Sequence, residues 1–187
     1  MKKTILLVGC LLFLQGCSTA PLQNELKEKE ATIAELNANV TTLKQAMDRY
    51  LPIYGLDKTA QAEEVHFYVH LPEDSSLKDQ LNVVASTLSR FKFSNLPIEV
   101  MRIEDRNGKK IALIDLREDS NHQSSWETGY FQGSTGGGAT TLTLAKSFLQ
   151  PNYKGDWIDG VEFYYKGKPM SEWDHVNLQG IIERKPE

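Results

Sequence analysis

Apolar residues recur at a spacing of seven along the segment that begins at Leu22. They form two interleaved series, the first made of Leu26, Ile33, Val40 and Met47 and the second of Leu22, Lys29, Leu36, Leu43 and Tyr50. This heptad repeat predicts a coiled-coil helix over residues 22–51, and Pro52 is expected to end it. The β-branched residues of the first series favour a parallel dimer. A single amphipathic helix lying on its own domain remains the alternative.

The pattern changes after this helix. Residues 52–64 turn polar and are interpreted as a hinge. "VHFYVHL" then alternates apolar and polar residues, which predicts a half-buried strand. The next segment has the spacing of an amphipathic helix, and Ser76 and Asp79 fit a capping box at its start.

The remaining segments predict further strands and one more helix. Asn107-Gly108 joins two apolar runs and indicates a hairpin. A helix is expected from about Gly138 to Gln150, followed by a strand in "DGVEFYYKG". The order β-α-β-β-α-β predicts an α+β domain over residues 65–187, with two helices packed on a mainly antiparallel sheet.

The N-terminal residues are typical of a secretory signal. Lys2 and Lys3 precede an apolar run, Ile5 to Leu14, that is too short to span a bilayer. It ends in "LQGC", which resembles the lipobox of bacterial lipoproteins. The resemblance implies a signal peptide over residues 1–16, lipid on Cys17 and a lipidated linker over residues 17–21. The protein is therefore expected at the cell membrane, lipid-anchored on the extracytoplasmic side.

Composition and charge narrow the functional classes. The chain has 187 residues, 40% of them hydrophobic, which is enough for one packed domain with attachments. Removing residues 1–16 would change the formal net charge from −4 to −6, which argues against nucleic acid as a partner. Cys10 would leave with the signal and Cys17 would carry lipid, so no cysteine site is expected.

A glycine cluster, "GSTGG", precedes the second helix of the domain and comprises Gly133, Ser134, Thr135, Gly136 and Gly137. A phosphate-binding Walker loop needs lysine at the helix start, but Lys146 lies two turns into the helix. A dinucleotide fingerprint needs a strand directly before the glycines, which "SSWETGYFQ" does not provide. The cluster is interpreted as a tight turn capped by Ser134 or Thr135, with a weak anion or ligand site as the alternative.

No catalytic constellation, metal site or cofactor site is expected from the sequence. Adjacent Asp174 and His175 are the strongest candidates for acid–base chemistry. The candidate contact residues are Trp126, Tyr130, Phe131, Trp173 and His175, because aromatic side chains beside polar loops suit sugar stacking or protein contacts. The alternative is that the aromatic residues cover the edge of the core.

From Val65 onward the sequence resembles a GerMN domain, a module of sporulation and germination proteins and of other envelope lipoproteins. The matching pieces are "VHFYV", "LPIEVMRIED", "KIALIDL", "GSTGG" and "GVEFYYKGKPMSEWDHVNL". The resemblance implies a small α+β module without known catalysis that binds envelope proteins or peptidoglycan, with "GSTGG" as a fold signature. The sequence thus predicts a non-catalytic scaffold that self-associates through its coil. The alternative is an envelope hydrolase, or a protein that binds a small ligand or peptidoglycan, using the glycine turn and Asp174-His175.

Overall fold

The protein is a mixed α/β protein, consistent with the α+β class. Its computed structural model describes residues 20–120 and 124–185, and over these residues it has four helices and two sheets. The contacts divide the chain into two compact units, one ending at Leu43 and the other beginning at Lys44. The predicted signal peptide, residues 1–16, and Cys17, the predicted site of lipidation, lie outside the described residues.

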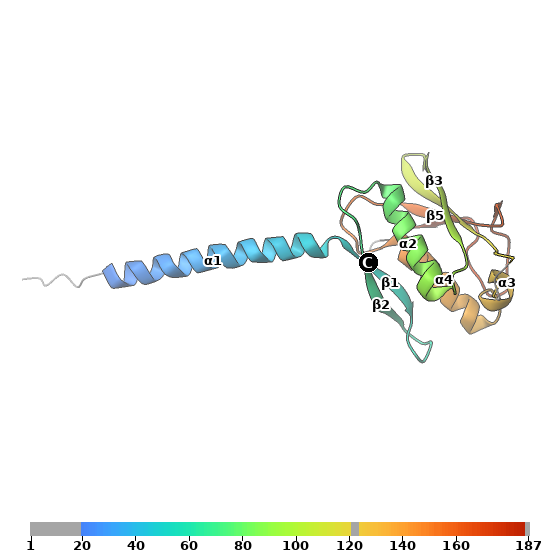
Figure 1. Ribbon diagram of the computed structural model, residues 1–187, viewed down its shortest axis with the longest axis horizontal. Coiled ribbons are helices and arrows are strands. Elements are labelled where there is room, and N and C mark those ends of the chain that lie inside the picture. Colours follow the sequence, from blue (N-terminus) through green and yellow to red (C-terminus); the bar gives the residue numbers. More distant parts are fainter. Residues whose placement is uncertain (1–19, 121–123, 186–187) are drawn as a thin grey trace, which may run out of the picture. The chain divides into compact units, whose positions relative to one another are not determined.

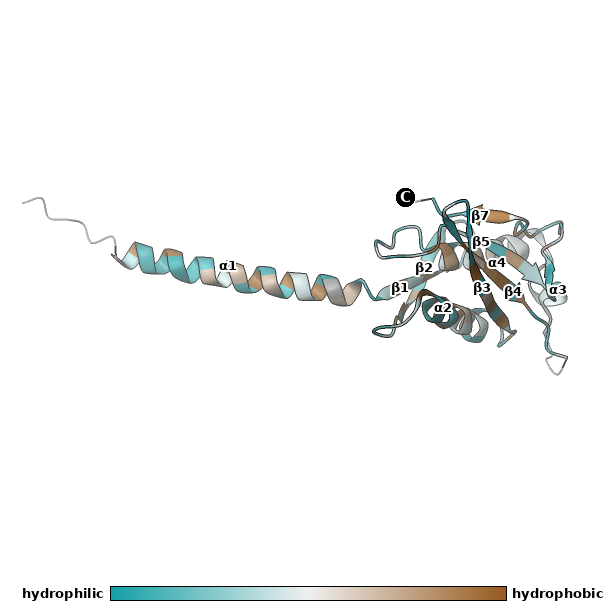
Figure 2. Cartoon of the chain, turned by 90° about the horizontal axis from the view of Figure 1, so that it is seen from above, coloured by the Kyte–Doolittle hydropathy of each residue, from teal (hydrophilic) through white to brown (hydrophobic). Residues whose placement is uncertain are grey.

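The first helix, α1 (Ala20–Met47), is continuous over its whole length (Figure 1). At 1.5 Å per residue it reaches about 42 Å. Hydrophobic and hydrophilic residues are interleaved along it (Figure 2). Over the described part of the chain, no helix combines the length and the apolarity that crossing a bilayer requires.

The hinge predicted for residues 52–64 is wrong, because this segment forms part of a β-hairpin whose first strand is largely buried. Strand β1 (Tyr50–Leu56) pairs antiparallel with β2 (Glu63–His70). Leu51 and Ile53 are fully buried, so tertiary packing of these side chains makes a strand where helix and then hinge were expected. Consequently α1 ends at Met47, and Pro52 lies inside β1 instead of ending the helix.

The second sheet has five strands. β3 (Ile98–Arg106) pairs antiparallel with β4 (Lys109–Leu116), and β4 pairs parallel with β5 (Gly160–Tyr165). The short strands β6 (Lys168–Pro169) and β7 (Ile181–Glu183) both pair antiparallel with β5. The Asn107-Gly108 turn is confirmed, with φ of 58° and 78° at the two residues. The prediction of a single sheet is wrong, because β2 pairs only with β1 among the described strands.

Three further helices complete the fold: α2 (Leu77–Lys92), α3 (Trp126–Gly129) and α4 (Ser134–Leu149). The Ser76–Asp79 capping box at the start of α2 is confirmed. Leu81, Val84 and Leu88 of α2 are buried, whereas Phe91 near its end is 62% exposed.

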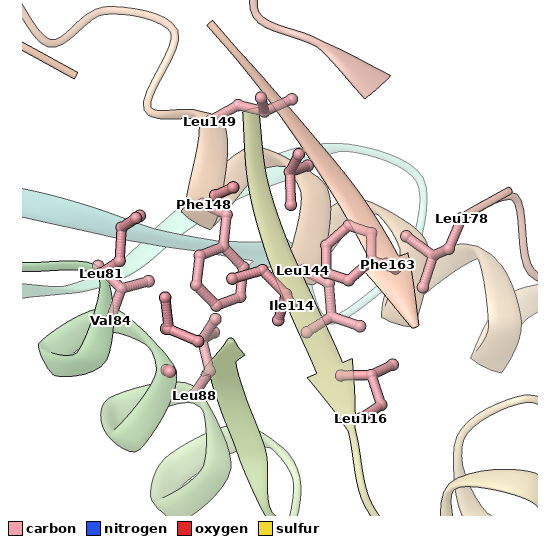
Figure 3. Packing of buried hydrophobic residues seen from close by; sticks show 14 of the residues in the cluster. Leu81, Val84, Leu88, Ile114, Leu116, Leu144, Phe148, Leu149, Phe163 and Leu178 are labelled. Carbon is pink, nitrogen blue, oxygen red and sulfur yellow. The ribbon is translucent and has the colours of Figure 1, made fainter. Parts of the chain in front are cut away.

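The hydrophobic core joins these helices to the sheets. Helix α4 lies against β1 and β5, and α2 lies against β3. Figure 3 shows Leu88 of α2, Ile114 of β4, Leu144 and Phe148 of α4 and Phe163 of β5 within one cluster of buried side chains. Each such side chain contributes roughly 1.5–3 kcal/mol when it leaves water. The core therefore fixes α4, whose N-terminus carries the glycine cluster.

Candidate functional site

The glycine cluster forms the first turn of α4. Gly133 is the N-cap residue, with φ of 73°, and no side chain accepts a hydrogen bond from the helix at this cap. Ser134 and Thr135 are inside the helix, so the expectation that one of them caps it is wrong. Glycine is favoured as the cap because L-residues with a side chain rarely adopt this positive φ.

Gly137 lies where the backbone of another part of the chain approaches α4 closely, which leaves no room for a side chain. A Cβ atom at this position would lie closer than 3.0 Å to the backbone of His175. Thr141, one turn further on, accepts a hydrogen bond from the backbone N–H of Asn177 at 3.0 Å and donates to the Gly137 carbonyl at 3.0 Å. The loop that carries Trp173, Asp174 and His175 is thus docked directly on α4.

A groove of about 490 Å³ lies where this loop meets the start of α4. Asp174 and His175 line this groove together with Ser134, which is distant from them in the sequence. Its other lining residues are Gly138, Thr141, Glu172, Trp173, Val176, Asn177 and Gln179. Among the described residues, no lysine or arginine lines it, so its side chains offer carboxylate, amide, hydroxyl and imidazole groups. This arrangement suits a polyhydroxylated or amide-bearing ligand better than a phosphate.

Two of the four predicted aromatic contact residues, Trp126 and Phe131, belong to the core instead of the surface. Trp126 and Phe131 are 0% and 1% exposed, so the prediction that they contact a partner is wrong. Trp126 donates from Nε1 to the Arg117 carbonyl at 3.0 Å, which satisfies its polar group in the interior. Their burial follows from mutual packing, with ring centroids 5.9 Å apart.

Tyr130 and Trp173 are half-buried and lie at the edge of this aromatic cluster. The Tyr130 hydroxyl lies 2.8 Å from Ser94 Oγ, and the Trp173 ring packs on Phe131 with centroids 5.0 Å apart. Trp173 lines the groove beside exposed His175. Of the five predicted contact residues, therefore, Trp173 and His175 are brought together at one surface.

A second hollow, of about 370 Å³, was not expected from the sequence. It is lined by His66 of β2 and Lys92 of α2, whose Nδ1 and Nζ atoms contact each other. His66 Nε2 lies 2.9 Å from the Leu56 carbonyl oxygen. Burial lowers the pKa of Lys92, and the nearby Glu64 carboxylate partly opposes this change. No sequence pattern relates His66 to Lys92, because the two residues lie on different elements and are 26 residues apart.

The apolar seam of α1 is the other candidate site. We define it as Leu22, Leu26, Ile33, Leu36, Val40, Leu43 and Met47, whose exposed fractions range from 46% to 72%. Lys29 lies in the same seam, and its Nζ atom is 2.7 Å from Glu25 Oε1 on the preceding turn. Exposed apolar rows of this extent mark interaction surfaces in soluble proteins.

None of these three sites gathers the ligands of a metal ion among its described residues. Within residues 20–120 and 124–185, no group of three His, Cys, Asp or Glu side chains is arranged to hold one. Comparisons of the chain with protein-family models, with curated proteins and with solved structures each found no match.

Proposed function

We propose that the protein is a lipoprotein anchored on the extracytoplasmic side of the cell membrane through Cys17, where it acts as a non-catalytic interaction module of the envelope. In chain order, a lipidated cysteine is followed by a self-associating helix and then by a binding domain. The lipobox-like "LQGC" sequence supports the anchor. Two or three acyl chains on one cysteine hold a protein at a bilayer far more firmly than one.

The exposed seam of α1 is the observation that carries this proposal. Its seven apolar side chains are each at least 46% exposed. Removing such a side chain from water contributes on the order of 1 kcal/mol or more, so a partner helix stabilises α1 substantially. Anchoring in a membrane raises the local concentration of copies and favours association of a helix this short.

The interior of the domain supports a non-catalytic role for the glycine cluster. Gly133 provides the positive φ of the helix cap and Gly137 admits the backbone of His175, so backbone conformation accounts for the first residue and packing for the second. This interpretation agrees with the GerMN resemblance, in which "GSTGG" is a fold signature. We extend the proposal to envelope assemblies of that kind, including those of sporulation or germination.

A second candidate function is favoured by the groove at Asp174 and His175. There the protein would bind peptidoglycan or a small ligand, or hydrolyse an envelope polymer. Both side chains are exposed in the groove and available to a ligand. Replacing His175 by Ala in the full chain tests this candidate: loss of binding to purified cell-wall fragments supports it, and unchanged binding and cell phenotype remove its main support.

The anchor is tested by feeding cells labelled palmitate while they express the full chain or its Cys17→Ser variant. We expect label and membrane association with the native chain and neither with the variant. Because the described domain begins beyond Cys17, the variant should keep its fold, which circular dichroism checks. A native chain that takes up no label and stays in the soluble fraction contradicts the proposal.

A further inference from the structure

We propose that α1 pairs with α1 of a second copy, parallel and in register, and that Lys29 sets this register. The inference deepens the proposed function by naming the partner of the seam and the residue that selects its alignment. It concerns the helix alone, so it can hold or fail independently of lipid on Cys17.

The residues of the seam favour two parallel strands. The first heptad series has Leu26, Ile33, Val40 and Met47, while leucine fills most of the second series. β-Branched residues in the first series with leucine in the second are the combination typical of parallel dimers. A second copy of the chain has the same heptad spacing. In a parallel in-register pair, each apolar residue of the seam therefore packs against the same residue of the other copy.

Lys29 is the exception, because it places a charge at a position that pairing would bury. In the structure its ammonium group contacts Glu25 of the same helix. In a parallel in-register pair, each residue of the second series lies opposite the same residue of the other chain. It also packs beside the next residue of that chain. Lys29 would then lie next to Glu30 of the second copy. The two Lys29 side chains face each other in this layer, and each ammonium group is flanked by Glu25 of its own chain and Glu30 of the other, so four carboxylates surround the two positive charges.

Other alignments leave this charge with fewer carboxylates. A parallel shift of one heptad places Lys29 opposite Leu22 or Leu36, beside Gln23 or Asn37, and neither amide carries a charge. In an antiparallel pair, Lys29 faces residues of the first series, which are all apolar. Burying a charge without a close counter-charge is costly, so these arrangements are disfavoured. Lys29 therefore lowers the stability of the pair and in return makes one alignment preferred.

Disulfide trapping in the full chain tests this alignment. The Ile33→Cys variant crosslinks to itself only if the helices are parallel and in register, because an antiparallel pair never places first-series residues opposite each other. The matched control is Ala38→Cys, on the outward face of the same heptad. We expect mild oxidation to give about tenfold more dimer for Ile33→Cys, which corresponds to roughly 1.4 kcal/mol. Equal yields overturn the parallel in-register pair.

The role of Lys29 is tested by adding Lys29→Leu to the same experiment. Co-expressed Ile33→Cys and Val40→Cys copies report a shift of one heptad through their mixed disulfide. We expect Lys29→Leu to raise this mixed product relative to the in-register product and to raise the dissociation temperature of the dimer. An unchanged product ratio overturns the assignment of register to Lys29, even if the dimer itself persists.

A Cys17→Ser background separates these outcomes from the anchor. Combined with Cys10→Ser, it removes both native thiols, which could form their own crosslinks if no lipid were attached and residues 1–16 were retained. In-register crosslinking in this background, together with no palmitate on the native chain, would support the helix pair and contradict the anchor. Palmitate on the native chain without in-register crosslinking would support the anchor and contradict the helix pair.

Discussion

Gly137 of α4 and His175 of the C-terminal loop are in backbone contact, so close that a Cβ atom on Gly137 would lie under 3.0 Å from the His175 carbonyl. This contact explains why glycine, a poor helix former, occupies position 137 in the first turn of α4. It also positions the loop that forms one wall of the groove. Packing between α4 and the loop thus accounts for Gly137, and the positive φ at the helix cap accounts for Gly133.

The first prediction follows from this contact. Gly137→Ala should destabilise the domain by about 2 kcal/mol or more, because the clash is with backbone and cannot be relieved by a rotamer change. Gly138→Ala is the matched control, since nothing lies within 4 Å of a Cβ there and alanine favours helix by up to about 1 kcal/mol. Urea unfolding of the full chains compares them. Equal midpoints for the two variants would show that the close approach is absent.

The second prediction concerns the segment first interpreted as a hinge. Leu51→Ala should lower the free energy of unfolding by about 2–5 kcal/mol, because its side chain is completely buried in the core. The matched control is Lys58→Ala in the exposed β1–β2 loop, which should change stability by no more than about 0.5 kcal/mol. Thermal unfolding measures both. If Leu51→Ala were as mild as the control, residues 50–56 would not belong to the folded domain.

The third prediction concerns stability in alkali. Burial, with a hydrogen bond to Glu118 Oε1 at 2.6 Å, raises the pKa of Tyr165 above its ordinary value of 10.0. The folded state therefore keeps this proton when the unfolded chain has lost it. The stabilisation is complete below about pH 10 and is lost as pH rises towards the folded-state pKa.

Tyr165→Phe checks this sign, because phenylalanine does not ionise. Its unfolding free energy should fall less steeply between about pH 9 and 11 than that of the native chain. At neutral pH it should be lower by roughly 1 kcal/mol, through loss of the Glu118 hydrogen bond. Tyr68→Phe, at an exposed residue of β2, serves as the control and should keep the native pH slope. Parallel slopes for native chain and Tyr165→Phe would contradict the assignment.

The fourth prediction concerns a buried carboxylate at the end of β4. Asp115 is fully buried, accepts a hydrogen bond from the Gly167 N–H at 3.0 Å, and lies 2.9 Å from Arg117 Nε. Asp115→Ala should destabilise the domain by about 1–3 kcal/mol, since it leaves a turn N–H unpaired. Glu99→Ala removes only the exposed partner of Arg117 and should cost less than about 1 kcal/mol. Chemical unfolding that ranks the two in the opposite order would contradict this account.

The sequence was sufficient to predict features whose interactions involve only neighbouring residues. The capping box at Ser76 and the turn at Asn107-Gly108 each depend on neighbouring residues, and both are present in the structure. The heptad spacing likewise predicted a helix, which α1 provides. Its pairing stays a prediction, because a single chain does not contain the partner.

The sequence failed where distant residues decide the outcome. Strand β1 forms because Leu51 and Ile53 pack into a core made largely of residues later in the chain. The local sequence around Pro52 does not indicate this long-range packing. Trp126 was expected at the surface because its neighbours in sequence are polar, yet its ring packs 4.8 Å from that of Phe93, centroid to centroid. In the candidate site, sequence adjacency placed Asp174 beside His175, but only the fold adds Ser134 and Thr141 to them.

The mass of the intact protein, purified from membranes in detergent, shows whether Cys17 carries lipid. We expect a chain that begins at Cys17 and carries the added mass of a diacylglycerol, with or without a further acyl group. A chain that retains residues 1–16 and has the unmodified mass of 21.1 kDa would contradict the anchor and, with it, the proposed function.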